Sequence, residues 1–350
     1  MTTRYRKVIV EKIVCETDSV KSFYLVAEDG SPLPAHLPGQ HLPLSLAIEG
    51  QDRAVFRCYT LSDCANGKYY RLTIKREHGN VDAGGPAGVG SGYFHDRVEV
   101  GHSLEAGAPS GGFCLDTSAN YPVVMIAGGI GVTPMIGMLS ALAEARSQRR
   151  VELFFSVRHG GEHLFREYLS ALKTALPNLR VRMFYTQPRA SDLAGKDYER
   201  AGRITMDDLR EHLEQPTTEY FLCGPSAMMQ EFSEALMDAG VPAQQIRTET
   251  FNTSARVPWA AAGVIKSAQV TFTISGVTAQ WTSAEGTLLD FAEKHGVAID
   301  YGCRYGDCAT CLTRVVEGDV EYLHTTGVEP EPGMCLPCSC RPVNDLSLEA

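Results

Sequence analysis

The residues best suited to chemistry are three cysteines that stand close together towards the C-terminal end of the chain. Cys303, Cys308 and Cys311 follow the spacing C-x4-C-x2-C, with which thiolates hold a plant-type [2Fe–2S] cluster. A loop around such a cluster must avoid bulky side chains, because its backbone N–H groups point at the sulfurs and tune the potential. Small residues meet this demand at Gly302, Gly306, Ala309 and Thr310. A fourth thiolate must come from further along the chain, and the candidates are Cys335, Cys338 and Cys340.

A zinc ribbon is the alternative interpretation of the same cysteines. Two C-x2-C pairs, one starting at Cys308 and the other at Cys335, match the way in which structural zinc is held. That arrangement leaves Cys303 without a role and does not account for the small residues of the loop, so we favour the iron–sulfur cluster. Six of the eleven cysteines fall within residues 303–340, which indicates metal binding in a reducing compartment rather than disulfides. We therefore expect a cytoplasmic protein.

Composition limits the classes of protein to which the chain can belong. It has 350 residues, 44% hydrophobic and 21% charged, so we expect two or three globular domains with buried cores. No secretory signal opens the sequence, and no apolar run reaches the roughly 18–20 residues of a membrane span. The net charge is −10, and residues 269–350 contribute −8 of it, from four Lys and Arg against twelve Asp and Glu. This charge argues against nucleic acid as a partner. It favours a protein partner with a basic docking face, or serves solubility alone.

The first 118 residues have the pattern of an antiparallel β-barrel. Short apolar or alternating runs, separated by turns rich in Gly, Pro and Asp, lie at Lys7–Ile13, Ser22–Val26, Phe56–Leu61 and Tyr69–Lys75. One of these strands carries four residues of interest, Arg57, Cys58, Tyr59 and Thr60. Residues 88–95 contain Gly90 and Ser91 at the expected start of a short helix, whose backbone N–H groups would form an anion site.

From residue 119 to residue 252, strands and helices alternate as in a doubly wound α/β sheet. The continuous apolar run 123–127 is typical of a buried parallel strand. A glycine-rich turn follows it, made of Gly128, Gly129, Ile130, Gly131, Val132 and Thr133. A second turn, Cys223-Gly224-Pro225, follows the apolar run 220–222. Ligands bind at the carboxyl ends of such strands, and a helix N-terminus after a glycine turn favours a pyrophosphate. The first turn departs from G-x-G-x-x-G, and a tight packing turn is its alternative interpretation.

The remaining residues divide into a linker and a third domain. Residues 253–268 combine Ser, Pro, Ala and Gly without periodicity and are expected to be a linker. The third domain occupies residues 269–350. Gly276 predicts a hairpin turn near its start, and a helix at 288–293 precedes the cysteine loop.

The order of these motifs resembles the ferredoxin–NADP⁺ reductase superfamily. The matching segments are Arg57-x-Tyr59-Thr60, Gly88-x-x-Ser91, Gly128-Gly-Ile-Gly-x-Thr-Pro134, Cys223-Gly-Pro225 and Glu249-x-Phe251. With its cysteine-rich domain, the whole chain resembles the single-chain reductase components that feed Rieske-type oxygenases. Its first two domains resemble the reductase part of flavohaemoglobins. The resemblance implies a multidomain fold: an antiparallel β-barrel flavin domain (1–118), an α/β doubly wound nucleotide domain (119–252) and an α+β β-grasp ferredoxin domain (269–350).

The resemblance also implies roles at the flavin. Arg57 would contact the flavin phosphate, Tyr59 would lie against the isoalloxazine, with Cys58 between them, and Thr60 would form a hydrogen bond near N5. Gly90 and Ser91 would hold the flavin phosphate, and Phe251 would close over the flavin edge. FAD is favoured, with FMN as the alternative.

At the other two sites the resemblance implies the following. The turn from Gly128 to Thr133 would bind the pyrophosphate of NADH, with NADPH as the alternative. Cys223, followed by Gly224 and Pro225, would sit beside the nicotinamide. For the fourth cluster ligand the family pattern L-x-C-x-x-x-P matches residues 336–342 and selects Cys338, with Cys340 as the alternative. Two departures from the family pattern are Ala309, where glycine is usual, and Pro337 before the ligand.

The function implied is an NAD(P)H-dependent flavin and iron–sulfur reductase. It would pass electrons to a partner protein, most naturally the oxygenase component of a Rieske-type system, docking near the acidic C-terminal domain. A P450 or another metalloprotein is an alternative acceptor. A self-sufficient reductase of a small molecule, and a zinc-bearing binding module on a degenerate flavoprotein scaffold, are the other hypotheses.

Overall fold

The structure, a computed structural model, describes residues 5–79, 88–213, 215, 217–251, 267–324 and 326–350. Two compact units emerge from the contacts within the chain. The first comprises Met1–Gln40, Tyr59–Glu105 and Phe113–Asn252, and the second comprises His41–Cys58, Ala106–Gly112 and Thr253–Ala350. The expected linker 253–268 lies outside the described residues, apart from its last two positions, which belong to a strand.

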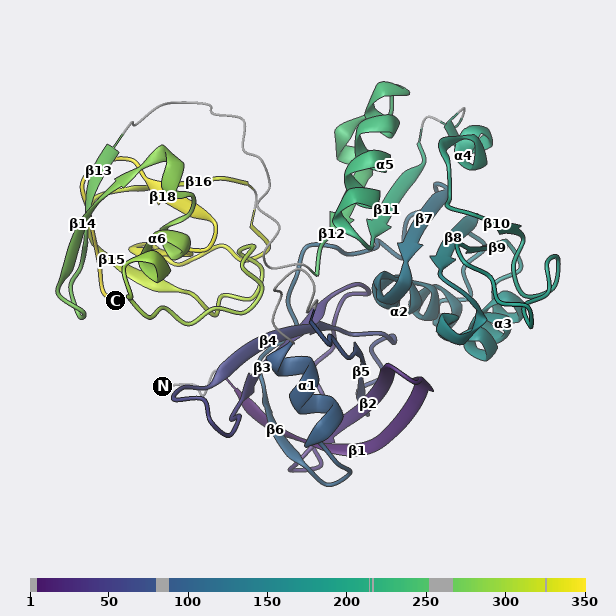
Figure 1. Ribbon diagram of the computed structural model, residues 1–350, viewed down its shortest axis with the longest axis horizontal. Helices are drawn as coiled ribbons and strands as arrows, with labels where there is room; N and C mark the ends of the chain where they lie inside the picture. Colours follow the sequence, from purple (N-terminus) through teal and green to yellow (C-terminus); the bar gives the residue numbers. More distant parts are fainter. Residues whose placement is uncertain (1–4, 80–87, 214, 216, 252–266, 325) are drawn as a thin grey trace. The chain divides into compact units, whose positions relative to one another are not determined.

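The N-terminal part forms a six-stranded sheet in the order β4-β3-β6-β1-β2-β5 (Figure 1). The strands are β1 (Arg6–Thr17), β2 (Val20–Ala27), β3 (His41–Leu46), β4 (Val55–Thr60), β5 (Tyr70–Lys75) and β6 (Ser103–Ala106). β2 pairs antiparallel with both β1 and β5. Helix α1 (Val89–Asp96) sends Phe94 into the core, where its ring meets Phe23 edge-on at 5.0 Å between centroids. The predicted antiparallel barrel is confirmed.

The α/β part contains one six-stranded sheet in the order β10-β9-β8-β7-β11-β12. Its strands are β7 (Val123–Gly128), β8 (Val151–Val157), β9 (Leu179–Tyr185), β10 (Arg200–Ala201), β11 (Glu219–Cys223) and β12 (Ile246–Glu249). Its helices are α2 (Val132–Glu144), α3 (Arg166–Ala175), α4 (Met206–Leu213) and α5 (Ser226–Asp238), with short 3-10 turns η2 (Gly129–Gly131), η3 (Gly160–Glu162) and η4 (Ala243–Gln245). All the paired strands are parallel.

Alternation along β7 assigns the helices to the two faces of this sheet. Val123, Met125 and Ala127 pack in one core with α2 and α3, whereas Val124 and Ile126 pack in another with α4 and α5 (Figure 1). Both faces of β7 are therefore covered, which explains its unbroken apolar sequence. The predicted doubly wound sheet is confirmed.

The C-terminal domain is an α+β fold around a five-stranded sheet in the order β14-β13-β19-β15-β17, with a second, two-stranded sheet of β16 and β18. Its elements are β13 (Ser267–Phe272), β14 (Val277–Thr282), η5 (Ser283–Glu285), α6 (Leu288–Lys294), β15 (Thr313–Glu317), β16 (Val320–Tyr322), β17 (Met334–Cys335), β18 (Cys340–Pro342) and β19 (Leu346–Leu348). β13 and β14 form the predicted hairpin at Gly276. A capping box of Thr287 and Asp290 starts α6, which satisfies two N–H groups of its first turn.

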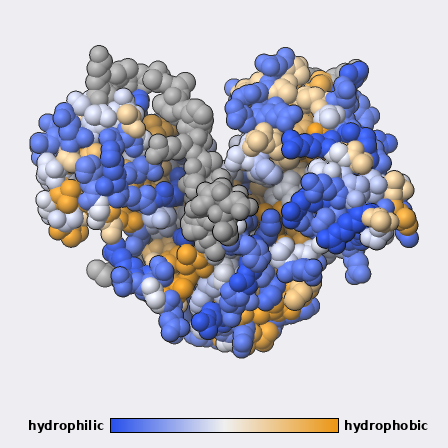
Figure 2. Space-filling model, viewed as in Figure 1, coloured by the Kyte–Doolittle hydropathy of each residue, from blue (hydrophilic) through white to orange (hydrophobic). Residues whose placement is uncertain are grey.

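The described residues include no helix long and apolar enough to cross a membrane. On the face drawn in Figure 2, hydrophilic side chains predominate and apolar ones form small patches.

Candidate functional site

The two turns that the sequence singles out in the α/β part lie against each other at the carboxyl edge of its sheet. β7 and β11 are parallel neighbours with Ala127 opposite Cys223, so the chain leaves both strands at the same level. A Cβ added to Gly131 would lie 2.3 Å from the carbonyl oxygen of Cys223, and one added to Gly128 would lie 2.7 Å from Cδ of Pro225. Glycine is required at both positions because the two turns are in direct contact. The structure thus brings these predicted residues together.

The glycine turn leads directly into α2. Gly129 has a φ of +55°, a left-handed conformation that glycine adopts without strain. The 3-10 turn η2 then passes into α2 at Val132, and the Thr133 hydroxyl donates a hydrogen bond to the carbonyl oxygen of Ile130 at 3.0 Å. The first N–H groups of a helix have no partner within it. The turn therefore presents backbone donors at the carboxyl edge of the sheet, as an anionic ligand requires.

Cys223 ends β11 as a buried, protonated thiol. Burial raises its pKa well above the ordinary value, and the carboxylate of Glu249, opposite it on β12, raises the pKa further. The uncharged thiol therefore adds no charge of its own to this edge. Gly224 and Pro225 continue the turn, and α5 begins at Ser226.

A pair of charged side chains at the end of β8 extends the same sheet edge. Arg158 follows the strand, and its guanidinium donates a hydrogen bond to the carboxylate of Glu162 in η3. This contact raises the pKa of Arg158. Beside it, Arg189 Nη2 lies 3.0 Å from His159 Nε2. In the sequence this pair is visible only as the spacing R-x-x-x-E over residues 158–162.

Strand β4 carries the first barrel motif at the edge of its sheet. Its residues are half-buried except for Thr60, which is buried. Arg57 Nη1 donates to the carbonyl oxygen of Phe56 at 2.7 Å, and the Tyr59 ring meets Phe94 edge-on at 5.2 Å. Cys58 lies between them and is half-buried. An edge strand with half-buried side chains can accept a flat ligand along its length.

The second barrel motif forms the start of α1. The Ser91 hydroxyl donates to the carbonyl oxygen of Gly88 and accepts from the N–H of Glu77, both at 3.1 Å. Gly90 is buried beside it. A cavity of about 380 Å³ opens here; its lining is Arg76, Glu77, His78, Gly88, Val89, Gly92, Tyr93 and Asp96. The cavity and the N-terminal N–H groups of α1 fit a phosphate-bearing group.

Phe251, the last predicted flavin contact, is the final described residue before residue 267. Its side chain is 43% exposed.

The cysteine loop gathers sulfur atoms and backbone donors. Cys303 Sγ accepts from the N–H groups of Tyr305 at 3.4 Å and Asp307 at 3.2 Å. The N–H of Cys303 donates to Cys308 Sγ at 3.3 Å. Hydrogen bonding to Cys303 holds the pKa of Cys308 well below its ordinary range. These donors are the type that stabilises metal-bound thiolates.

The downstream cysteines separate into two environments. Cys338 Sγ lies 3.2 Å from Cys311 Sγ, and the Cys338 side chain also contacts Cys303. Cys340 instead forms a hydrogen bond with Cys335, and both pack in the hydrophobic core under the sheet. Among the six cysteines of residues 303–340, the gathered sulfurs are therefore those of Cys303, Cys308, Cys311 and Cys338; Cys58 of β4 also contacts Cys308. Four gathered cysteine sulfurs, with backbone donors aimed at Cys303 and Cys308, match the thiolate donor set of a [2Fe–2S] cluster, so the residues present fit that group.

The loop includes two strained positions, Arg304 with a φ of +59° and Ala309. Ala309 has a φ of +53°, a left-handed conformation that costs a non-glycine residue about 1–2 kcal/mol. Glycine adopts this conformation without strain.

Comparisons with known proteins agree with this geometry. Residues 125–234 match the family described as oxidoreductase NAD-binding domain, and residues 272–343 match the 2Fe-2S iron-sulfur cluster binding domain. The chain is 36% identical over 251 residues to a flavohemoprotein of Bacillus cereus, covering 72% of this chain and 62% of that protein. It is 38% identical over 247 residues to a flavohemoprotein of Chromobacterium violaceum, covering 71% and 60%. The chain thus spans about three fifths of the length of these curated relatives.

Solved structures extend the likeness over the whole chain. The flavohem-like FAD/NAD binding domain of nitric oxide dioxygenase from Vibrio cholerae has a TM-score of 0.62 and 30% identity, over 70% of this chain and 98% of that one. Phthalate dioxygenase reductase has a TM-score of 0.60 and 21% identity, over 99% and 98%; at this identity it is similar in fold alone.

Fold and matches define the class: one chain that joins a β-barrel and an oxidoreductase NAD-binding domain to a 2Fe-2S cluster-binding domain. The chain belongs to the ferredoxin–NADP⁺ reductase superfamily. The resemblance predicted from the motifs is confirmed.

Proposed function

We propose that the chain is an NADH-dependent reductase that delivers single electrons to a partner protein. The observation that carries the proposal is that one chain contains three sites. They are the glycine turn packed against the Cys223 turn, strand β4 together with the N-terminus of α1, and the four gathered cysteines. When bound, a flavin would provide the hydride acceptor for NADH, and a [2Fe–2S] cluster would provide a one-electron carrier. The protein residues bind, orient and shield these groups.

The α/β turn would hold the dinucleotide through backbone atoms. The N–H groups from Gly129 to Gly131 and the positive end of α2 would favour the pyrophosphate by about 0.3–1 kcal/mol. Cys223 would lie beside the nicotinamide as a neutral thiol, because its raised pKa keeps charge away from the ring. The close contact of the two turns fixes the spacing between these groups.

The barrel would hold the flavin on β4 and α1. Arg57 would neutralise a flavin phosphate, Tyr59 would cover the ring, and Thr60 would offer its hydroxyl near N5. Gly90 and Ser91 would shape the phosphate cradle, and Phe251 would complete the site. We propose FAD rather than FMN, because the Vibrio cholerae structure is named as an FAD/NAD binding domain.

We propose Cys303, Cys308, Cys311 and Cys338 as the cluster ligands. Support comes from their gathered sulfurs and from the N–H donors on Cys303 and Cys308. The hydrogen bond between Cys340 and Cys335 argues against Cys340. None of the eleven cysteines is in a disulfide, which supports a reducing compartment, and we propose the cytoplasm.

We propose NADH as the preferred nucleotide because Arg158 already forms an ion pair with Glu162. A free arginine at the end of this strand would accommodate the 2′-phosphate of NADPH. Here the carboxylate of Glu162 takes up the Arg158 guanidinium. That carboxylate would repel a phosphate and can accept a hydrogen bond from a ribose hydroxyl.

The partner we propose is an oxygenase component, with a P450 as the alternative. Support comes from the likeness in fold to phthalate dioxygenase reductase and to a self-sufficient cytochrome P450 monooxygenase. The charge of −8 on residues 269–350 suits a partner with a basic docking face.

Two acceptors test the proposal. Ferricyanide takes electrons directly from a reduced flavin, whereas cytochrome c is a basic one-electron acceptor that should dock on the acidic domain. The wild-type protein should reduce both with NADH, and a Cys303→Ser variant should keep the ferricyanide rate and lose most of the cytochrome c rate. Equal cytochrome c rates in the two proteins would contradict the proposed electron route.

A further inference from the structure

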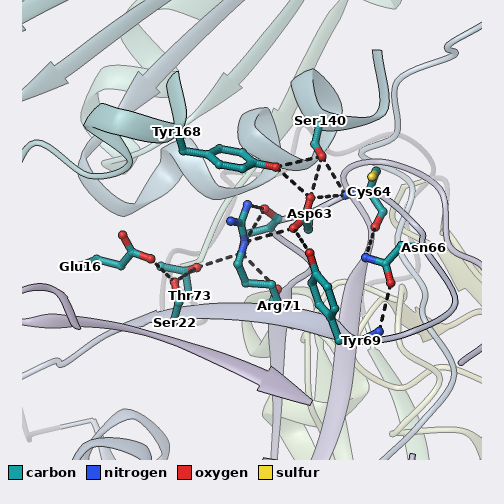
Figure 3. Close-up of polar contacts among 11 residues, drawn as sticks. Glu16, Ser22, Asp63, Cys64, Asn66, Tyr69, Arg71, Thr73, Ser140 and Tyr168 are labelled. Carbon is teal, nitrogen blue, oxygen red and sulfur yellow. Dashed lines mark hydrogen bonds and ion pairs between the residues drawn. The ribbon is translucent and has the colours of Figure 1, made fainter. Parts of the chain in front are cut away.

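A buried carboxylate lies where the turn after β4 meets the α/β part, and the residues that contact it all belong to the first compact unit. Asp63 stands in the turn that follows β4, and its side chain is 9% exposed. Its two oxygens accept from different directions (Figure 3). From the barrel side, Tyr69 Oη donates to Oδ2 at 2.9 Å, and the N–H of Cys64 donates to Oδ1 at 3.0 Å.

The other donors come from two helices of the α/β part. Ser140 on α2 donates to Asp63 Oδ1 at 2.6 Å, and Tyr168 on α3 donates to the same oxygen at 3.0 Å. Tyr168 Oη also lies 3.1 Å from Ser140 Oγ. Three hydroxyl groups and one N–H therefore converge on a single carboxylate, and two of the hydroxyls belong to helices of the α/β part.

Steric contact reinforces the same junction. Gly137, one turn before Ser140 on α2, approaches the backbone that precedes Asp63. A Cβ added there would lie 2.7 Å from the carbonyl oxygen of Leu61. The backbone of α2 is thus in contact with the barrel backbone at this point, and the hydrogen bonds of Asp63 fix the orientation of the helix relative to that backbone.

Arg71 supplies the matching positive charge. Its Nε lies 3.8 Å from Asp63 Oδ2, and its guanidinium stacks on the rings of Tyr168 at 4.5 Å and Phe165 at 5.2 Å. Burial alone would raise the pKa of Asp63, but Arg71 and the hydroxyl donors outweigh it, so the pKa lies below the ordinary value. The carboxylate is ionised, and charge-assisted hydrogen bonds of this kind are about twice as strong as neutral ones.

The junction lies on the two segments that carry the proposed cofactor contacts. Asp63 is three residues after Thr60, and Ser140 is in the helix that begins at the end of the glycine turn. A helix transmits position along its axis, so a shift at Ser140 moves the turn at Gly131 relative to Tyr59 and Thr60 at the end of β4.

We propose that Asp63 is a positioning residue that sets the distance between the flavin-binding strand and the nucleotide-binding turn, and so the rate of hydride transfer between the two cofactors. The inference rests on the proposed function. Asp63 touches neither cofactor motif and acts through Ser140 and Tyr168. Orientation effects of this kind are steep, since a misplacement of about 1 Å can slow a reaction about 100-fold.

The test uses the holoprotein and compares Asp63→Asn with Tyr168→Phe. The asparagine amide keeps one acceptor oxygen and turns an NH₂ group towards the remaining donors, whereas Tyr168→Phe removes one hydroxyl and keeps the ring over Arg71. The matched control is Thr73→Val. The Thr73 hydroxyl forms hydrogen bonds at 2.8 Å with both Ser22 and Ser62, so it belongs to the same polar chain but stays inside the barrel.

Anaerobic stopped-flow mixing with NADH gives the rate constant of flavin reduction, and thermal unfolding gives the stability. We expect hydride transfer to slow about 10- to 100-fold in Asp63→Asn and less in Tyr168→Phe. Thr73→Val should lower the unfolding temperature and keep the wild-type rate constant. A deuterium isotope effect with 4-deuterated NADH should persist in all variants, because the chemical step is the one that slows.

The outcomes separate this inference from the proposed function. If wild-type flavin is not reduced by NADH, the proposed function fails, and the inference fails with it. If the wild type is reduced and Asp63→Asn and Tyr168→Phe match its rate constant, the positioning role alone is overturned. If Thr73→Val slows hydride transfer as much as Asp63→Asn, the effect is general stability, and the positioning role is again overturned.

Discussion

Replacing Gly131 by alanine isolates the steric demand of the paired turns. The φ of Gly131 is −62°, which any residue adopts, so the backbone conformation does not require glycine. The demand is spatial, because the added Cβ would lie 2.3 Å from the carbonyl oxygen of Cys223, and ordinary contact starts at 3.4 Å. The two turns must separate by about 1 Å, which corresponds to about a 100-fold loss of kcat/KM for NADH. At 1.36 kcal/mol per tenfold change, this is about 2.7 kcal/mol of transition-state stabilisation.

The assay is anaerobic flavin reduction over a range of NADH concentrations, with dithionite as a reductant that bypasses the nucleotide site. Gly112→Ala is the matched control, because a Cβ there meets nothing within 4 Å. Gly131→Ala should be reduced normally by dithionite and about 100-fold less efficiently by NADH. A folded Gly131→Ala protein with wild-type kcat/KM would refute the reasoning, because the turns would then carry no nucleotide.

Three further predictions concern the cluster, the nucleotide and pH. Cys338→Ser should abolish cluster absorbance while Cys340→Ala retains it, because Cys338 lies with the gathered sulfurs; the opposite result would reverse the assignment. Glu162→Gln should raise kcat/KM for NADPH relative to NADH about 10-fold by releasing Arg158, and an unchanged ratio would contradict the proposal. Burial lowers the pKa of His163 from 6.5 to about 4. The unfolded chain therefore takes up a proton first as pH falls, and urea unfolding should show stability decreasing between pH 6.5 and 4, by at most about 3 kcal/mol. His163→Gln should make this decrease smaller, and an equal slope in both proteins would rule out His163.

The sequence predicts the elements of the fold where local patterns are strong. The apolar run 123–127 and the glycines after it predict both β7 and the turn, because a doubly covered strand cannot alternate. The cysteine spacing predicts the loop from Cys303 to Cys311 for a comparable reason, since it is set by local geometry.

Features that depend on long-range packing cannot be predicted from local sequence patterns alone. Cys338 and Cys340 are two residues apart, and they differ in space because Cys338 lies beside Cys311 whereas Cys340 packs against Cys335. Asp63 and Ser140 are 77 residues apart in the chain. Neither belongs to a motif, and a carboxylate in a turn is ordinarily solvated, so no sequence signal reveals their hydrogen bond.

The most direct test of the account is anaerobic titration of the purified holoprotein with NADH, followed by visible absorbance and electron paramagnetic resonance. The account predicts that flavin and iron–sulfur absorbance fall together and that the rhombic signal of a reduced [2Fe–2S] cluster develops. Loss of flavin absorbance with an unchanged cluster and no rhombic signal would contradict it.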